Sequence, residues 1–212
     1  MFDDNNGAGP VYHFFAQAQR TRYVRRWGIK HSHVPENTLE HSAEVAMICH
    51  ALAMIRLHIT GGDPIDPNQA AVLGLMHDLS ESITGDAITP AKNASPEILS
   101  AFKAMERGAE QLLINSLPPQ LREHYKPLVQ HDHMPEEYRR LVKAADLISA
   151  LNHCERETHL GNQEFKEALV DIRTRLSGYD DMPEVAYFMQ HCQPSYSASL
   201  DRQLADAVTA AE

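Results

Sequence analysis

Residues that start or stop helices recur along this chain, and they constrain its fold more than any other feature of the sequence. Asn37 followed by Glu40 forms a capping box, and the apolar-periodic stretch that it opens runs to His58, before Gly61 and Gly62. Similar signals divide the rest of the chain, with proline at the first helical position or glycine after the last. We expect helices over residues 10–24, 37–58, 66–85, 95–117, 119–129, 135–160, 163–176 and 183–191. No alternating pattern of useful length predicts a strand, so the sequence predicts an all-α fold.

Length and composition predict one domain. The chain has 212 residues, of which 43% are hydrophobic, and this suffices for one substantial core. Because no shift in composition divides it, we expect a single domain over residues 1–212 with its core at about 10–195. We expect the last ten residues to fray.

Charge and cysteine usage narrow the compartment and the partners. The formal net charge of -10 disfavours nucleic acid polymers and anionic membranes, which are themselves negatively charged. No apolar run approaches the roughly 18 to 20 residues of a membrane span. The first ten residues, MFDDNNGAGP, are acidic and polar where a secretory signal is basic and then apolar. Cys49, Cys154 and Cys192 form no CxxC pair, which is typical of a reducing compartment. We therefore expect a soluble, cytoplasmic protein.

Ionisable residues inside apolar helices indicate a metal site. His41 lies at one end of an apolar stripe with helical spacing, and by itself it is better explained as a core histidine with one hydrogen bond. In the next predicted helix, His77 and Glu81 share a face and Asp78 lies about 100° round from His77. Burying two carboxylates beside an imidazole costs several kcal/mol unless a cation compensates. A divalent metal is the simplest such cation.

Asp146 is a charged residue inside the apolar run LVKAADLISAL. An ion pair with Lys143 or an arginine is one explanation for it. Taken with His41 and the adjacent His77 and Asp78, however, it completes in order the His, His-Asp, Asp signature of HD-domain phosphohydrolases. Ligands from three helices suit a mixed nitrogen and oxygen site with positions open to water and substrate.

Four longer motifs extend this resemblance over nearly the whole chain: NTLEHSAEVAMICHALA, MHDLSESITGD, LVKAADLISAL and PSYSASLD. Together they resemble the YfbR-type 5'-deoxynucleotidases, which remove phosphate from deoxyribonucleoside 5'-monophosphates. The resemblance implies a single-domain HD helical bundle and a metal-dependent hydrolase. It places metal ligands at His41, His77, Asp78 and Asp146, the catalytic glutamate at Glu81, and substrate contacts at Arg26, Trp27, Asp86 and Thr89. Between the last two positions the family has a proline where this chain reads Ala87 and Ile88.

The chemistry of these residues fits phosphate-ester hydrolysis. Such hydrolysis is very slow without a catalyst, so positioning and charge neutralisation supply most of the acceleration. Glu81 is placed to handle a proton, and Arg26 belongs to the densest basic cluster of the chain, whose guanidinium groups suit phosphate oxygens. Lys92, just beyond Asp86, is a further candidate phosphate contact, or otherwise a surface lysine. Trp27 either walls the sugar site or packs its segment against the core.

Several alternatives stay open at the level of sequence. The substrate of an HD-type hydrolase could instead be a nucleoside triphosphate or an alarmone, and the scaffold could serve a non-catalytic nucleotide sensor. The cation could be Co, Mn, Zn, Fe or Mg. The pairs His131 with His133 and His31 with His33 are better explained as loop residues than as a second metal site. The long apolar helices would suit a homodimer.

Overall fold

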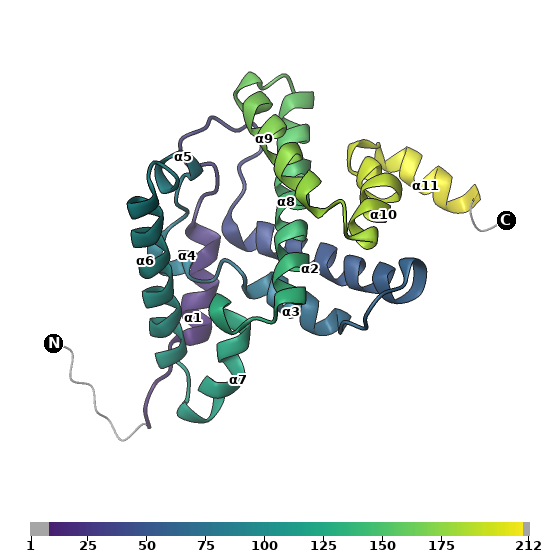
Figure 1. The fold of residues 1–212 in the computed structure, drawn as a ribbon. Coiled ribbons are helices and arrows are strands. Elements are labelled where there is room, and N and C mark those ends of the chain that lie inside the picture. The colour runs from purple at the N-terminus through teal and green to yellow at the C-terminus, as the bar shows by residue number, and fades with distance from the viewer. Residues whose placement is uncertain (1–8, 210–212) are drawn as a thin grey trace.

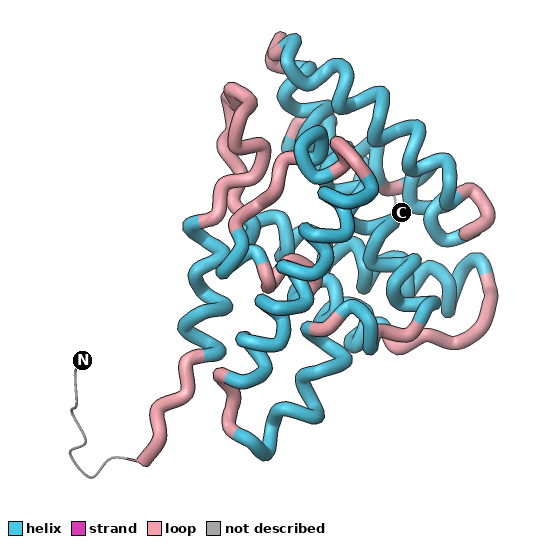
Figure 2. The backbone as a smooth tube through the Cα atoms, turned by 60° about the vertical axis from the view of Figure 1, so that its left-hand side comes forward, coloured by secondary structure: helices cyan, strands magenta, loops and turns pink. Residues whose placement is uncertain are grey.

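The computed structural model describes residues 9–209, and these residues form helices joined by short connections (Figure 1). The α-helices are α1 (Phe14–Ala18), α2 (Thr38–Ile55), α3 (Pro67–Met76), α4 (Glu81–Thr84), α5 (Thr89–Lys92), α6 (Pro96–Asn115), α7 (Pro119–Val129), α8 (Glu136–His159), α9 (Lys166–Leu176), α10 (Pro183–His191) and α11 (Leu200–Thr209). Shorter 3₁₀ turns are η1 (Gln19–Tyr23), η3 (His131–His133), η4 (Gln163–Phe165), η5 (Ser177–Tyr179) and η6 (Gln193–Ser197), and η2 (Arg56–Thr60) is a π-helical turn. Within residues 9–209 the structure has no strand, which confirms the all-α prediction (Figure 2).

Helix α2 lies at the centre of the molecule and packs against both α3 and α8. Its predicted capping box is present, because the Asn37 side chain accepts from the Glu40 backbone and the Glu40 side chain accepts from the Asn37 backbone. With η2 it makes a continuous stretch, Thr38–Thr60, that is long and apolar enough to cross a membrane. The expectation of no such run was therefore wrong. One third of its apolar window is buried, and there α2 contributes residues such as Val45, Ile48 and Leu52 to the core.

The predicted helix over 66–85 is interrupted. It starts as expected, with the Asp66 side chain accepting from the Asn68 backbone, and Gly85 ends it with a φ of 72°. Between α3 and α4, however, residues 77–80 form a turn with bonds that span three residues, such as the Glu81 N–H to the Asp78 carbonyl at 3.1 Å. The interruption matters for function, because this turn contains the His-Asp pair.

The two ends of the chain differ from expectation. The helix predicted over 10–24 begins only at Phe14 and continues as the 3₁₀ turn η1, since the backbone N–H groups of His13 and Phe14 bond outward to the Ser116 carbonyl. The C-terminal residues were expected to fray, but α11 extends to Thr209 with all its side chains exposed. A bond from the Arg202 N–H to Ser199 Oγ starts α11, and an Arg202 to Asp206 ion pair supports it. Residues 210–212 lie outside the described part.

The core has two apolar clusters. The larger gathers residues of α2, α3, α8, α9 and α10, and the smaller lies among α1, α6 and α7. Leu73 of α3 belongs to the larger cluster and Leu79 to the smaller. His77 and Asp78 lie between these two leucines in sequence, so the turn that holds them is anchored in the core on both sides.

Candidate functional site

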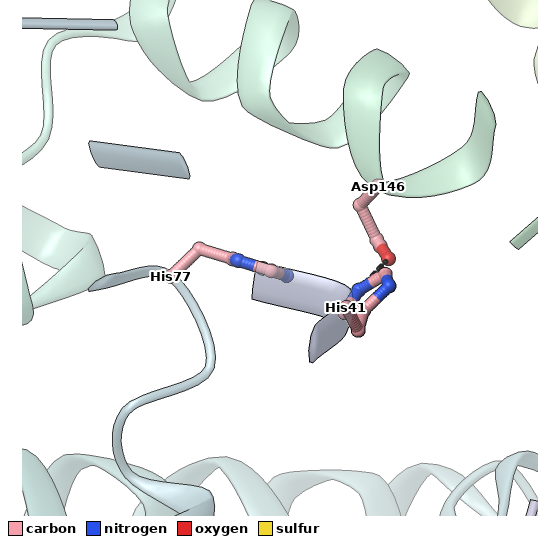
Figure 3. Close-up of side chains that lie close together, drawn as sticks. All are labelled: His41, His77 and Asp146. Carbon is pink, nitrogen blue, oxygen red and sulfur yellow. Dashed lines mark hydrogen bonds and ion pairs between the residues drawn. The ribbon is translucent and has the colours of Figure 1, made fainter. Parts of the chain in front are cut away.

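Three predicted metal ligands converge from three helical segments. One nitrogen or oxygen atom from each of His41, His77 and Asp146 lies within 4.8 Å of the other two (Figure 3). His41 comes from the first turn of α2, His77 from the C-terminal end of α3 and Asp146 from the middle of α8. His41 is fully buried, and its Nε2 lies 3.1 Å from Asp146 Oδ1. The predicted convergence of these three residues is confirmed.

The orientation of His77 fits a metal ligand. Its Nδ1 lies 2.7 Å from the Gly74 carbonyl, which can only accept a hydrogen bond, so Nδ1 carries the hydrogen. Its Nε2 is buried and has no hydrogen-bond partner among residues 9–209. The carboxylate of Asp78 lies only 2.9 Å from this nitrogen, but the contact does not have the alignment of a hydrogen bond. A buried nitrogen held in this way is what a histidine ligand requires.

Asp78 is the fourth predicted ligand, and its Oδ2 faces several charged groups. It lies 3.8 Å from His41 Nε2 and 3.4 Å from the Nη1 atom of Arg26. Although burial opposes ionisation, the neighbouring His77 holds the pKa of Asp78 well below its usual range. Burial likewise opposes charge on His77, but Asp78 raises the pKa of His77 to about 9. The carboxylates of this site therefore stay ionised and attract positive charge, as a cation site does.

Asp146 also forms an ion pair with Lys143, which was the alternative explanation for a charged residue in this apolar run. Lys143 Nζ lies 2.6 Å from Asp146 Oδ2, while the other carboxylate oxygen faces His41. Burial works against ionisation of Asp146, but Lys143 and His41 lower its pKa well below the ordinary value. The two explanations are compatible, since one carboxylate serves both neighbours.

Glu81 lies at the start of α4, beside this cluster. Its Oε2 accepts a hydrogen bond of 2.8 Å from the hydroxyl of Thr38, the first residue of α2. Burial, followed by repulsion from Asp78 and Asp86, raises the pKa of Glu81 to about 8. A carboxyl group that holds its proton at neutral pH can donate it, and once ionised it can accept one.

Arg26 is the member of the basic cluster that points inward. Its side chain is 12% exposed, whereas the neighbouring Arg25 is exposed. Its Nε donates to Glu36 Oε2 at 3.0 Å, and its Nη1 donates to Asp78. Burial opposes the charge of Arg26, but four carboxylates led by Asp146 and Asp78 raise its pKa above the usual value. A charged guanidinium group thus lies beside the candidate ligands His41, His77, Asp78 and Asp146, which we call the ligand cluster.

Trp27 has an unusual backbone and a packed side chain. Its φ of 58° lies in the left-handed region, which a bulky residue rarely adopts. Its ring stacks on His153 with a centroid distance of 5.6 Å and contacts Phe165 edge-on at 5.3 Å. Its Nε1 donates to the same Glu36 oxygen that holds Arg26. Packing against other side chains therefore explains one face of this ring. Contact of Trp27 with a sugar stays a prediction.

The remaining predicted substrate contacts follow α4. Asp86 comes directly after Gly85, and burial raises its pKa while Arg26 opposes the shift. Thr89 and Lys92 form the ends of the short helix α5, where Thr89 is exposed. Lys92 Nζ lies 2.5 Å from Glu106 Oε1 of α6, so its charge is paired within the protein. The structure tests the substrate roles of these three residues no further, and they stay predictions.

The other histidine pairs have structural partners. His131 Nδ1 lies 2.7 Å from the buried carboxylate of Glu110, and among the described residues no three ligand-type side chains gather around it. The rings of His31 and His33 lie edge to face at 5.7 Å, and the His33 backbone N–H bonds to Glu157.

Sequence reasoning missed the residues that hold the predicted ones. Glu36 orients Arg26 and Trp27, and Thr38 holds Glu81. Glu157, whose side chain is 0% exposed, accepts from the backbone N–H groups of His33 and Val34. Glu36 directly precedes the capping residue Asn37, and this position was a signal from which it could have been found. Nothing in the sequence distinguishes Glu157 from the other charged residues of α8.

Most of the chain matches known proteins. Residues 13–196 match the family model described as 5'-deoxynucleotidase YfbR-like. The chain is 40% identical over 189 residues to a 5'-deoxynucleotidase of Vibrio vulnificus, covering 89% of this chain and 96% of that protein. It is 38% identical over 189 residues to one of Klebsiella pneumoniae, covering 89% and 94%.

Solved structures share the fold. An HD-domain phosphohydrolase from Listeria innocua has a TM-score of 0.77 at 20% identity, covering 94% of this chain and 98% of that one. The HD phosphohydrolase of cyanophage S-2L, bound to dA and one catalytic Zn²⁺ ion, has a TM-score of 0.57 at 21% identity, covering 85% and 96%. These neighbours confirm the predicted HD helical bundle. The length of the family match and the identity to curated relatives go further, and they show that this chain belongs to the YfbR-like 5'-deoxynucleotidase family.

Proposed function

We propose that this protein is a metal-dependent phosphohydrolase that converts deoxyribonucleoside 5'-monophosphates to deoxyribonucleosides and phosphate. The observation that carries the proposal is the convergence of His41, His77 and Asp146, with Asp78 and the charged Arg26 beside them. Relatives at about 40% identity are named 5'-deoxynucleotidases, which supports both the reaction and the class of substrate.

The cluster fits a divalent cation, because the buried Nε2 of His77 makes no hydrogen bond among residues 9–209 and has an ionised carboxylate, that of Asp78, 2.9 Å away. His41, His77, Asp78 and Asp146 would hold it. When bound there, such a cation supplies positive charge to phosphoryl oxygens and a water of lowered pKa. We leave the cation open among Co, Mn, Zn, Fe and Mg, because nitrogen and carboxylate ligands accept several of these metals.

The chain's own residues supply the remaining functions. Arg26 binds the phosphate with a guanidinium group that Glu36 and Asp78 hold in place before substrate arrives. Glu81 transfers a proton at the leaving 5'-oxygen, since its pKa of about 8 keeps the carboxyl protonated at neutral pH. Asp86, Thr89 and Lys92 line the approach after α4, and Trp27 bounds the sugar.

We also propose that the protein is a homodimer. Support comes from α11, where Leu200, Leu204 and Val208 repeat every four residues and are all exposed. A helix of ten residues is marginal in water without packing of its apolar face. Sedimentation velocity tests this, and a monomer at micromolar concentration would contradict it.

Phosphate release from a panel of nucleotides tests the proposed activity. The panel contains mono- and triphosphates in both ribo and deoxy forms, with an alarmone, each assayed with several divalent metals. We expect inorganic phosphate from dAMP and other deoxyribonucleoside 5'-monophosphates, and none after chelation. Preferred hydrolysis of a triphosphate or the alarmone would reassign the substrate. Tight nucleotide binding without turnover under every metal would indicate a sensor.

A further inference from the structure

The second ring nitrogen of His41 leads into a buried polar chain that the reaction itself does not use. His41 Nδ1 lies 3.0 Å from the hydroxyl oxygen of Ser149, one turn beyond Asp146 on α8. Ser149 is fully buried, and its hydroxyl lies 2.9 Å from Glu44 Oε2 on α2. A histidine ligand is thus connected through one serine to a carboxylate on its own helix.

The direction of each hydrogen in this chain follows from the groups involved. A carboxylate has no hydrogen to give, so the single hydroxyl hydrogen of Ser149 points to Glu44. The serine oxygen can then only accept from His41, which requires a hydrogen on His41 Nδ1. When a cation takes the lone pair of Nε2, the neutral ring keeps its hydrogen on Nδ1; without a cation, Nε2 faces the Asp146 carboxylate at 3.1 Å, which can only accept.

Glu44 is itself fixed in place. Its other oxygen, Oε1, accepts a hydrogen bond of 2.9 Å from the Asn152 amide on α8. The Asn152 oxygen accepts from Gln193, whose amide also donates to Glu155 at 2.6 Å. Gln193 begins η6, the turn that overlaps the C-terminal motif PSYSASLD. This chain therefore links the C-terminal segment to the ligand cluster.

We propose that Glu44 and Ser149 are positioning residues that keep His41 in the tautomer with its Nε2 lone pair available to the cation. This inference rests on the proposed metal site. Histidine ligands commonly donate the N–H of their second ring nitrogen to a partner that fixes the ring. Here the partner is a serine whose hydroxyl hydrogen is directed to a carboxylate. Glu44 acts only through Ser149, since it contacts the serine and not the ring.

The substitution Glu44→Gln tests this with almost no change in shape. Asn152 donates on the Oε1 side, so the new amide places its oxygen there and its NH₂ group toward Ser149. The serine then accepts from this NH₂ and turns its own hydrogen to His41 Nδ1. The ring is driven to carry its hydrogen on Nε2, where it blocks the cation. We expect the affinity for Zn²⁺ to fall by about tenfold, as for other outer partners of metal ligands.

Zinc affinity is measured by titrating chelator-stripped protein against a competing dye. Glu110→Gln is the matched control, because it alters a buried carboxylate that also holds a histidine, His131, outside the ligand cluster. We expect this control to leave zinc affinity unchanged, even if its melting temperature falls as much as that of Glu44→Gln.

A double-mutant cycle separates positioning from simple loss of charge. Ser149→Ala should also weaken zinc binding, and Glu44→Gln should have no further effect in that background. Unchanged affinity in Glu44→Gln would overturn the inference, as would an equal loss with and without the serine hydroxyl. In both of those cases the unmodified protein still binds zinc and the proposed function stands. Failure of the unmodified protein to bind any divalent cation would overturn both proposals.

Discussion

Gly74 allows α3 to lie close to α2, and Gly74→Ala should disturb both stability and the ligand cluster. A Cβ at this position would lie 2.8 Å from Cys49 Sγ, 3.1 Å from Ala46 Cα and 3.2 Å from Ala46 N. Cys49 is fully buried and two of these atoms belong to the backbone, so α3 must move away from α2. The Gly74 carbonyl also holds His77, so the movement reaches the ligand cluster.

The size of the effect follows from two opposing contributions. Alanine is favoured over glycine inside a helix by about 1 kcal/mol. Overpacking a filled core costs about 1 to 3 kcal/mol. Gly74→Ala should therefore range from nearly neutral to about 2 kcal/mol destabilising. Gly108, on an exposed face of α6, provides the control, since a Cβ there meets nothing within 4 Å among the described residues. Gly108→Ala should stabilise by the propensity contribution alone.

The difference between these two variants isolates the steric contribution. At about 2 to 4 °C per kcal/mol for a chain of this length, Gly74→Ala should melt about 2 to 12 °C below Gly108→Ala. Zinc affinity should fall only in Gly74→Ala. Adding Cys49→Ala removes the nearest atom, so the double variant should recover part of both losses. If Gly74→Ala melts together with Gly108→Ala, the close approach of α3 to α2 is not limited by this glycine.

The remaining predictions concern three site residues. His77→Ala should remove metal binding and activity together, and stoichiometric metal in the purified variant would contradict its role as a ligand. Glu81→Gln should bind metal and substrate but lower kcat by about 100-fold or more, as expected for loss of proton transfer. The pKa of Glu81 rises from 4.5 to about 8 on folding. The metal-free protein should therefore lose stability relative to Glu81→Gln as the pH rises from about 4.5 to about 8. Denaturant titrations at pH 5 and 8.5 measure this loss. Trp27→Ala should narrow the ratio of kcat/KM between dAMP and AMP; a lower melting temperature with an unchanged ratio would assign Trp27 to packing alone.

Helical spacing explains why the inward positions of His41 and Asp146 could be predicted from the sequence. His41 and Asp146 each interrupt an apolar stripe, and a residue on such a stripe must face the core whatever the details of packing. Spacing did not predict the turn at residues 77–80, because LMHDLSES continues the helical pattern without a glycine or proline. The turn arises from tertiary structure, since Leu73 and Leu79 pack into different clusters on either side of it.

The predicted substrate contacts rest mainly on resemblance, because they depend on a loop without periodicity. Between Val24 and Asn37 the chain follows no repeating pattern, and its shape is set by two carboxylates, the half-buried Glu36 and the buried Glu157. Glu36 accepts hydrogen bonds from the side chains of Arg26 and Trp27. Further along the loop, Glu157 accepts hydrogen bonds from two consecutive backbone N–H groups. Although burial opposes it, these backbone bonds and the Asn162 amide lower the pKa of Glu157 to about 2. Glu157 therefore stays ionised over the whole pH range in which Glu81 titrates. The loop that positions Arg26, the proposed phosphate contact, thus keeps its anchor while Glu81, the proposed proton-transfer residue, changes charge.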